Sequence, residues 1–268
     1  MPTASMTDGG RGGSSPSRLH GKRALVYGGG TGLGLACAEA LLQAGAAVFI
    51  TGRRRDKLAA AADRLGGLGR IGLAEGDFTQ EADVARVTGQ AVDFLGGIDT
   101  LVVSSGRSSI GSIFTATPVE FQALMTTNLF GPFLAVRAAA PHLEAGAPSS
   151  VILMASVVAS VAMRERVAYC TSKAGIVGMT RALALDFADR GVRVNAISPS
   201  LVLTELAREI LSREKDPAAT LKRREGQHPV GRLGRPEDIG AAAVYLASEE
   251  SSWTTGQDLV IDGGLSIV

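Results

Sequence analysis

Cysteine, surplus charge and long apolar runs are all scarce in this sequence of 268 residues, and each scarcity excludes a class of protein. The only cysteines, Cys37 and Cys170, fall in predicted helices, which excludes a disulfide framework and a cysteine-based zinc site. The 27 basic residues balance the 26 acidic ones to a net charge of +1, so we expect no nucleic-acid or membrane partner. No apolar run is long enough to span a bilayer, and the three histidines are isolated, so no metal site is expected. These absences favour a protein of the reducing cytoplasm.

Residues 1–18 differ in composition from the rest of the chain. Gly, Ser and Pro dominate them, and they contain no apolar stretch like the core of a signal peptide. We expect a disordered tail here, with a targeting role as the less favoured alternative. The remainder, residues 19–268, has the length and apolar content of one α/β domain with a sizeable core.

Strand and helix patterns alternate from Gly21 onward. The expected strands are continuous apolar runs at Arg23–Tyr27, Ala47–Thr51, Ile71–Glu75, Thr100–Ser104, Ser150–Ala155, Val192–Ile197 and Leu259–Ile261. The expected helices between them are Gly32–Gln43, Arg55–Leu65, Glu81–Leu95, a single long one from Pro118 to Leu143, and Val167–Ala188. This alternation predicts a Rossmann-type, doubly wound, mainly seven-stranded parallel sheet with helices on both faces. A charged excursion at about 200–226 interrupts it, and we expect this segment to cover a site.

A glycine-rich run, Gly28 to Gly34, lies between the first strand and the first helix. Glycine permits a tight turn and lets a pyrophosphate approach backbone N–H groups at a helix N-terminus. A glycine run alone is weak evidence, but strand before and helix after make an ordinary flexible turn improbable. The sequence therefore predicts a dinucleotide site.

The end of the second strand bears on which dinucleotide is bound. An NAD site usually places a carboxylate there, whereas this chain has three arginines, Arg53 to Arg55. Arg53 has the planar fork that can clamp a 2′-phosphate, so NADP(H) is preferred over NAD(H). The alternative is that these arginines form only a solvated helix start. Asp77, after the third strand, is expected to accept a hydrogen bond from the adenine amino group, or to cap the next helix instead.

A tyrosine and a lysine, Tyr169 and Lys173, stand four residues apart on a predicted helix, so that they project from one face. A phenol ordinarily titrates near pH ~10 and is a poor proton donor or acceptor at neutrality. A nearby ammonium group favours the phenolate and lowers that pKa. Ser156 lies thirteen residues before the tyrosine, at the end of a predicted strand.

Together these motifs resemble the short-chain dehydrogenase/reductase family, its main Tyr-x-x-x-Lys branch, over roughly residues 20–268. The stretches from Asn195 to Pro199, from Gly231 to Asp238 and from Thr255 to Gly264 also resemble the family. The resemblance implies an oxidoreductase that transfers hydride between a nicotinamide and a ketone or secondary alcohol. Tyr169 would be the acid/base. Lys173 would lower its pKa and bind the nicotinamide ribose, and Ser156 would polarise the carbonyl.

The resemblance extends to a fourth catalytic position and to the binding residues. Asn128 matches the helix asparagine that holds a water in the proton relay; its alternative role is that of a polar residue that bends the helix. The expected cofactor-binding residues are Gly28, Gly30, Thr31, Gly32, Leu33, Gly34, Arg53, Asp77, Phe78, Ser104, Gly106, Tyr169, Lys173, Pro199, Leu201, Val202 and Thr204. The expected substrate-binding residues are Ser156, Val158, Tyr169 and Leu206.

Three positions depart from the family pattern. Tyr27 replaces a threonine and places a bulkier side chain beneath the glycine run. Val103-Ser104-Ser105-Gly106 stands after the fourth strand where the family usually has Asn-Asn-Ala-Gly, so Val103 and Ser104 replace the two asparagines. Ser200 replaces the glycine after Pro199, which stiffens the loop over the nicotinamide.

The expected substrate wall consists of the segments Arg107–Ile113, Val157–Met163 and Leu201–Arg224. The middle segment is apolar, which favours an apolar or moderately hydrophobic ketone or alcohol. One alternative is reduction of 3-oxoacyl groups on an acyl carrier protein, which would need a basic docking patch. Another is a regulatory protein that binds the dinucleotide but has lost catalysis. The resemblance also implies a homo-oligomer, usually a tetramer and possibly a dimer.

Overall fold

The computed structural model describes residues 17–268, and most of the expected disordered tail lies outside the described residues. Its last two residues, however, belong to the folded domain. The Ser17 hydroxyl donates to the Ala44 carbonyl at 2.7 Å, and Arg18 forms an ion pair with Glu250 at 2.5 Å. Ser17 and Arg18, which were predicted to belong to the tail, therefore pack against the folded domain.

Seven strands of the described chain form one parallel sheet, as predicted. In sequence order they are β1 (Arg23–Tyr27), β2 (Ala47–Gly52), β3 (Ile71–Glu75), β4 (Thr100–Val103), β5 (Ser149–Met154), β6 (Val192–Pro199) and β7 (Asp258–Ile261). Their order across the sheet is β3-β2-β1-β4-β5-β6-β7, so the winding direction reverses between β1 and β4. In doubly wound sheets, ligands bind at the carboxyl ends of the strands beside that reversal.

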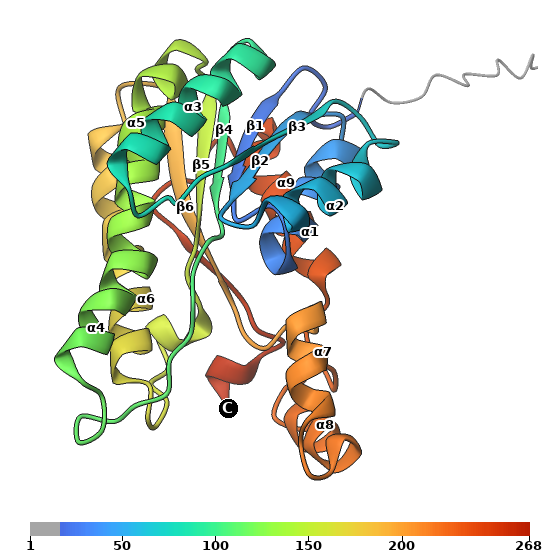
Figure 1. Ribbon diagram of the computed structural model, residues 1–268, viewed down its shortest axis with the longest axis vertical. Coiled ribbons are helices and arrows are strands. Elements are labelled where there is room, and N and C mark those ends of the chain that lie inside the picture. Colours follow the sequence, from blue (N-terminus) through green and yellow to red (C-terminus); the bar gives the residue numbers. More distant parts are fainter. Residues whose placement is uncertain (1–16) are drawn as a thin grey trace, which may run out of the picture.

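Helices cover both faces of the sheet (Figure 1). One face carries α3 (Glu81–Leu95), α5 (Gly131–Ala145) and α6 (Val167–Asp186). The other carries α1 (Gly32–Gln43), α2 (Arg55–Leu65) and α9 (Pro236–Ala247). Two separate apolar cores result, one on each face, and the strands contribute alternate side chains to each. Val48 and Ile50 of β2 enter the α1 side, whereas Phe49 enters the α3 side.

The predicted long helix is interrupted at Asn128. It consists of α4 (Pro118–Met125), a π-helical turn η1 (Thr126–Phe130), and α5. Thr117 caps its start in a reciprocal capping box with Glu120, which satisfies two otherwise unpaired N–H groups. A π-turn inserts one extra residue and rotates the side chains that follow, so the helix is irregular where Asn128 lies.

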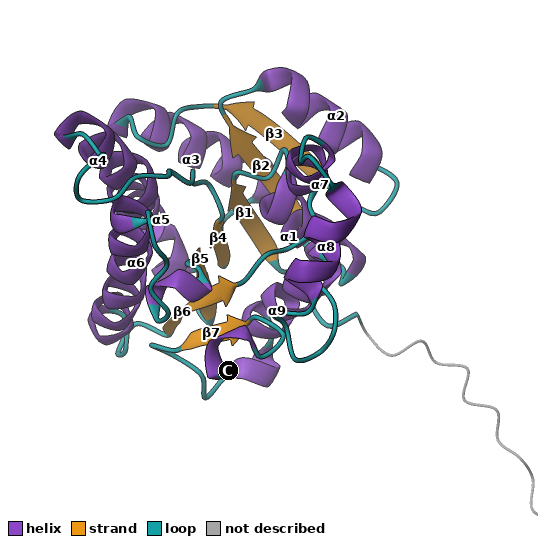
Figure 2. Ribbon diagram, turned by 90° about the horizontal axis from the view of Figure 1, so that it is seen from below, coloured by secondary structure: helices purple, strands orange, loops and turns teal. Residues whose placement is uncertain are grey.

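The charged excursion forms two helices, α7 (Glu205–Ser212) and α8 (Pro217–Glu225), neither of which contains a buried residue. Both project from the carboxyl end of the sheet, as does the loop after β4 (Figure 2). This end therefore carries the segments that can enclose a ligand.

Candidate active site

The glycine turn follows β1 at the reversal of the sheet. Gly28 has a φ of 82°, a left-handed conformation that favours glycine, and its N–H donates to the Thr51 carbonyl at 2.8 Å. A side chain at Gly34 would collide with the Gly28 carbonyl, so α1 can begin directly above the turn only without one. The turn therefore packs closely against the start of α1 and presents a surface of backbone atoms.

The N-terminus of α1 faces this surface without a side-chain cap. Thr31 occupies the N-cap position, but its hydroxyl accepts no hydrogen bond from the first turn of the helix. The first N–H groups of a helix have no intrahelical acceptor, so they are available to an anion. Arg54 brings a positive charge to the same place, because its guanidinium donates to the Thr31 hydroxyl at 3.4 Å.

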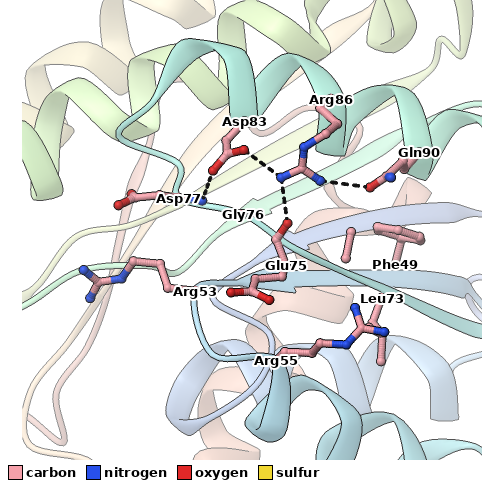
Figure 3. A pocket seen from close by; sticks show the side chains of 11 residues that line it. Phe49, Arg53, Arg55, Leu73, Glu75, Gly76, Asp77, Asp83, Arg86 and Gln90 are labelled. Carbon is pink, nitrogen blue, oxygen red and sulfur yellow. Dashed lines mark hydrogen bonds and ion pairs between the residues drawn. The ribbon is translucent and has the colours of Figure 1, made fainter.

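A cavity of about 700 Å³ lies at the ends of β2 and β3. Arg53 and Arg55 both line it, and within residues 17–268 neither side chain forms a hydrogen bond or ion pair (Figure 3). The strand end itself carries no acid, as expected, but Glu75 of β3 lines the same cavity. Arg86 is already engaged, because it donates to the Asp83 carboxylate at 2.7 Å and to the Glu75 carbonyl at 2.9 Å. Arg53 and Arg55 are thus the two cations of this cavity that have no partner within residues 17–268.

Asp77 and Phe78 differ in how they face the cavity at the ends of β2 and β3. Asp77 lines the cavity and accepts from the Thr79 backbone N–H at 3.0 Å and from its hydroxyl at 2.8 Å. The N-cap of α3 is Gln80, so the alternative of Asp77 as the helix cap is wrong. The Phe78 ring is buried beside the Tyr27 ring, with centroids 6.4 Å apart, so only its backbone can face a ligand.

A second cavity, of about 200 Å³, brings the expected catalytic residues together. Ser156, which precedes a short 3₁₀ turn η2 (Val157–Ala159), Tyr169 and Lys173 of α6, and Pro199 at the end of β6 all line it. Its lining also contains Leu33, Ser104 and Gly106, which were predicted to bind the cofactor, and Arg107 and Ser108, which belong to an expected segment of the substrate wall. Met154, Ala155 and Ser200 line it as well and were not predicted as site residues. Tyr169 and Ser156 are thirteen residues apart in sequence, and the β5-to-α6 connection folds them onto one cavity.

Lys173 is 5% exposed, and its ammonium group donates to the Met154 carbonyl at 2.8 Å. Burial lowers the pKa of Lys173 to about 8. Its Nζ lies 6.0 Å from the centroid of the Tyr169 ring. Burial also raises the pKa of Tyr169, while the Ser156 hydroxyl and the Arg166 charge act to lower it. In this geometry the net direction is upward, so the expected lowering by Lys173 does not dominate.

Asn128 is buried between the loop after β4 and α6. Its Oδ1 accepts from the Arg107 backbone N–H at 2.9 Å, and its Nδ2 donates to the Arg107 carbonyl at 2.8 Å. Nδ2 also donates to the Ser172 hydroxyl at 3.0 Å. The side chain therefore holds a wall of the catalytic cavity, a role that the sequence did not indicate.

The departures from the family pattern are accommodated locally. Tyr27 points away from the glycine turn into the core, where its hydroxyl shares a 3.1 Å hydrogen bond with Thr88. Ser105 packs against Gly28 so closely that a Cβ there would lie 2.8 Å from the Ser105 nitrogen and hydroxyl. Ser200 donates to the buried ring of His228 at 2.9 Å. The ring's Nδ1 faces the Arg224 carbonyl at 2.8 Å.

The remaining predicted residues lie outside both cavities. Thr204 caps α7 through the Ala207 N–H at 3.2 Å, and its methyl group lies opposite the glycine turn near Gly32. Val202 and Val158 are buried, and Leu206 is 64% exposed on α7. Five other predicted residues line neither cavity: Gly28, Gly30, Thr31, Gly34 and Leu201.

The fold and these two cavities define a dinucleotide-binding α/β protein with a serine, tyrosine and lysine at the carboxyl end of its sheet. A family profile described as Enoyl-(Acyl carrier protein) reductase matches residues 28–266. The D-threitol dehydrogenase of Mycolicibacterium smegmatis is 38% identical, over 93% of this chain and 95% of the relative. The 2-(S)-hydroxypropyl-CoM dehydrogenase 3 of Xanthobacter autotrophicus is 32% identical, over 94% of this chain and 99% of the relative. The crystal structure of a short-chain type dehydrogenase/reductase from Mycobacterium marinum has a TM-score of 0.87 and 36% identity, covering 94% of this chain and 98% of that chain.

The chain therefore belongs to the short-chain dehydrogenase/reductase family, a family of oxidoreductases that use NAD(P). In the part of the chain that the structure describes, no helix is both long and apolar enough to cross a membrane. Among the same residues, no group of three or more His, Cys, Asp or Glu side chains could hold a metal ion.

Proposed function

We propose that this protein is an NADP(H)-dependent oxidoreductase acting on a ketone or secondary alcohol, with Tyr169 as its acid/base. The observation that carries the proposal is the convergence of Ser156, Tyr169 and Lys173 on one cavity of about 200 Å³. That cavity lies at the sheet reversal, beside a glycine turn and an uncapped helix N-terminus that fit a dinucleotide. When bound, the nicotinamide supplies or accepts the hydride.

The chain's own residues would supply the proton and hold the reacting oxygen. The Ser156 hydroxyl would donate to the carbonyl oxygen and stabilise the negative charge that develops there. The Tyr169 phenol would protonate that oxygen in reduction and accept the proton in oxidation. Lys173 is buried beside the phenol, where a cation favours phenolate, and Asn128 holds the cavity wall that faces it.

The preference for NADP(H) is supported by the cavity at the ends of β2 and β3. Two arginines without partners among the described residues, Arg53 and Arg55, line it beside the acidic residues Glu75, Asp77 and Asp83. A guanidinium group matches the geometry of a phosphate and binds it through two hydrogen bonds. The Arg54 guanidinium lies beside Thr31 at the N-terminus of α1, where it adds positive charge near the expected pyrophosphate position.

An apolar or moderately hydrophobic substrate is supported by the exposed side chains of the two projections. The loop after β4 exposes Ile113 and Phe114, at 75% and 93%, and α7 exposes Leu206 and Ile210, at 64% and 54%. Clusters of exposed large apolar side chains are typical of surfaces that bind a ligand or a partner. One relative is named for D-threitol, which is polar, so a polyol is the class that this proposal has to exclude.

Two other functions are less well supported. Docking of an acidic carrier protein needs a basic patch, but residues 204–226 carry six basic and five acidic side chains. A regulatory binder without catalysis would have no need of an intact serine, tyrosine and lysine on one cavity.

Localisation and assembly are also proposals. We propose a cytoplasmic homotetramer, with a dimer as the smaller alternative. Assembly is supported by exposed apolar residues away from the active site: Phe130 and Phe133 stack with centroids 6.2 Å apart, and Leu185 and Trp253 are 79% and 100% exposed.

The test is hydride transfer measured by NADPH and NADH absorbance against a panel of aliphatic ketones, aryl ketones, sugars and polyols. We expect activity with apolar ketones and a preference for NADPH. Tyr169→Phe should lower kcat by at least about 100-fold, because general acid–base catalysis contributes that much. Activity in neither protein would support the binder, and turnover of polyols alone would refute the apolar substrate.

The cofactor preference has its own variant. Arg53→Asp should reverse the preference for NADPH, because the substitution removes a phosphate ligand and adds a repelling carboxylate. The matched control is Arg64→Asp on the outer part of α2, where the arginine pairs with Glu39 and lines neither cavity. An unchanged NADPH preference in Arg53→Asp would show that Arg53 does not bind the phosphate.

A further inference from the structure

The loop after β4 is attached to α6 at two places, and both lead to Tyr169. Asn128 makes the first attachment, since it bonds both backbone groups of Arg107 and the Ser172 hydroxyl. That hydroxyl in turn donates to the Tyr169 carbonyl at 2.8 Å. The first attachment therefore runs from the cavity wall to the backbone of the acid/base.

Arg166 makes the second attachment, three residues before Tyr169. Its Nη1 donates to the Ser109 carbonyl at 2.7 Å and to the Ser108 hydroxyl at 3.1 Å. The backbone of the loop also pairs with the start of α6. Gly111 and Arg166 form an isolated parallel bridge, in which the Gly111 N–H donates to the Glu165 carbonyl at 2.8 Å. One guanidinium and one short bridge thus hold the loop that carries Arg107 and Ser108, which line the catalytic cavity.

The residue that accepts the Gly111 N–H is Glu165, whose φ is 56°. The left-handed region is unfavourable for a residue other than glycine, so surrounding contacts must hold Glu165 there. The contacts available are the Gly111 bridge and the two bonds of Arg166. Several independent contacts therefore hold the connection between β5 and α6 at the point where α6 begins.

Charge adds to geometry at this point. The charged and titratable groups near the phenol are Lys173, Cys170 and Arg166 on α6, and Arg107 on the loop after β4. The Arg166 charge lowers the pKa of Tyr169 and so opposes the effect of burial. The Lys173 ammonium group donates one hydrogen bond to the Met154 carbonyl. Arg166 is a second cation near the phenol, and its hydrogen bonds go to the loop after β4 instead.

We propose that Arg166 is a positioning residue, which holds the 107–111 wall of the substrate cavity in register with Tyr169. Its charge also favours the ionised phenol. The proposal rests on the proposed function for its catalytic consequence, but its structural consequence can be measured without turnover. Arg164 is a matched control, because it is an exposed arginine in the same connection and makes no hydrogen bond or ion pair within residues 17–268.

The first measurement is amide hydrogen exchange of residues 108–111 in the substrate-free protein. We expect Arg166→Met to speed exchange at the Gly111 amide at least about 10-fold, with Arg164→Met unchanged, because the bridge loses its side-chain support. The second is an ultraviolet difference titration of the Tyr169 phenol, with Tyr169→Phe subtracted. Here Arg166→Met should shift the ionisation to higher pH than in wild type and in Arg164→Met, and Arg166→Lys should restore most of the difference.

The third measurement uses the alcohol identified by the substrate panel. Arg166→Met should raise KM about 10-fold and move the rising limb of kcat/KM in oxidation to higher pH. Arg166→Lys should restore the limb but not KM, because an ammonium cannot reproduce the bonds of a planar guanidinium. Gly111 exchange and phenol ionisation equal to those of Arg164→Met would overturn the proposal. Retained activity in Tyr169→Phe would instead overturn the proposed function, whatever the exchange shows.

Discussion

Replacing Lys173 with methionine should stabilise this protein at neutral pH while it abolishes activity. The ammonium group is buried, and none of the carboxylates in residues 17–268 forms an ion pair with it. Burial therefore lowers the pKa of Lys173 from the ordinary 10.5 to about 8. At roughly 1.4 kcal/mol per pH unit, this difference corresponds to about 3 kcal/mol. The folded state bears that cost wherever the lysine is charged in both states.

The sign of the pH dependence follows from the two pKa values. Below pH 8 both states hold the proton, so the cost is present in full. Between pH 8 and 10.5 the folded state has lost the proton while the unfolded state keeps it, so the wild-type free energy of unfolding rises. Lys173→Met has no such proton, but it loses the hydrogen bond to the Met154 carbonyl, which is worth about 1 kcal/mol.

The variant should thus be more stable than the wild type by about 2 kcal/mol at pH 7, and this advantage should vanish by about pH 10. Urea unfolding of both proteins at unit intervals from pH 7 to pH 10 measures the difference. Lys57→Met is the matched control, because it removes a lysine that is exposed on α2. A difference between Lys173→Met and wild type that stays constant over this range would refute the reasoning.

Two further substitutions test whether Ser200 and Tyr27, which depart from the family pattern, affect stability and cofactor binding. Ser200→Ala leaves the buried His228 ring without its donor, so we expect a loss of about 1–3 kcal/mol in urea unfolding and a higher KM for NADPH. Normal stability would show that this hydrogen bond does not hold the loop after β6. Tyr27→Phe should cost about 1 kcal/mol through its bond to Thr88 and leave cofactor KM unchanged, because the ring points into the core. A raised cofactor KM would mean that Tyr27 supports the glycine turn after all.

The elements of the sheet were predictable because each is encoded within a few residues. Apolar runs of strand length alternated with helical segments, and all seven predicted strands are present to within two residues. The long helix from Pro118 to Leu143 was predicted without its π-turn, because a π-turn leaves no mark on apolar periodicity. The glycine turn was visible for the same local reason, since its conformation depends on residues that adjoin in sequence.

The fold class, the glycine turn and the candidate serine, tyrosine and lysine could be inferred from local patterns alone, since spacing along a strand or helix dictates which side chains share a face. The tertiary structure decided what surrounds them. Burial sets the pKa of Lys173, and packing against Thr88 turns Tyr27 away from the cofactor side. Arg166 acquires its partners from a loop 57 residues earlier in the chain. Contacts between distant segments and removal from water exist only after the chain has closed on itself, so no local pattern can report them.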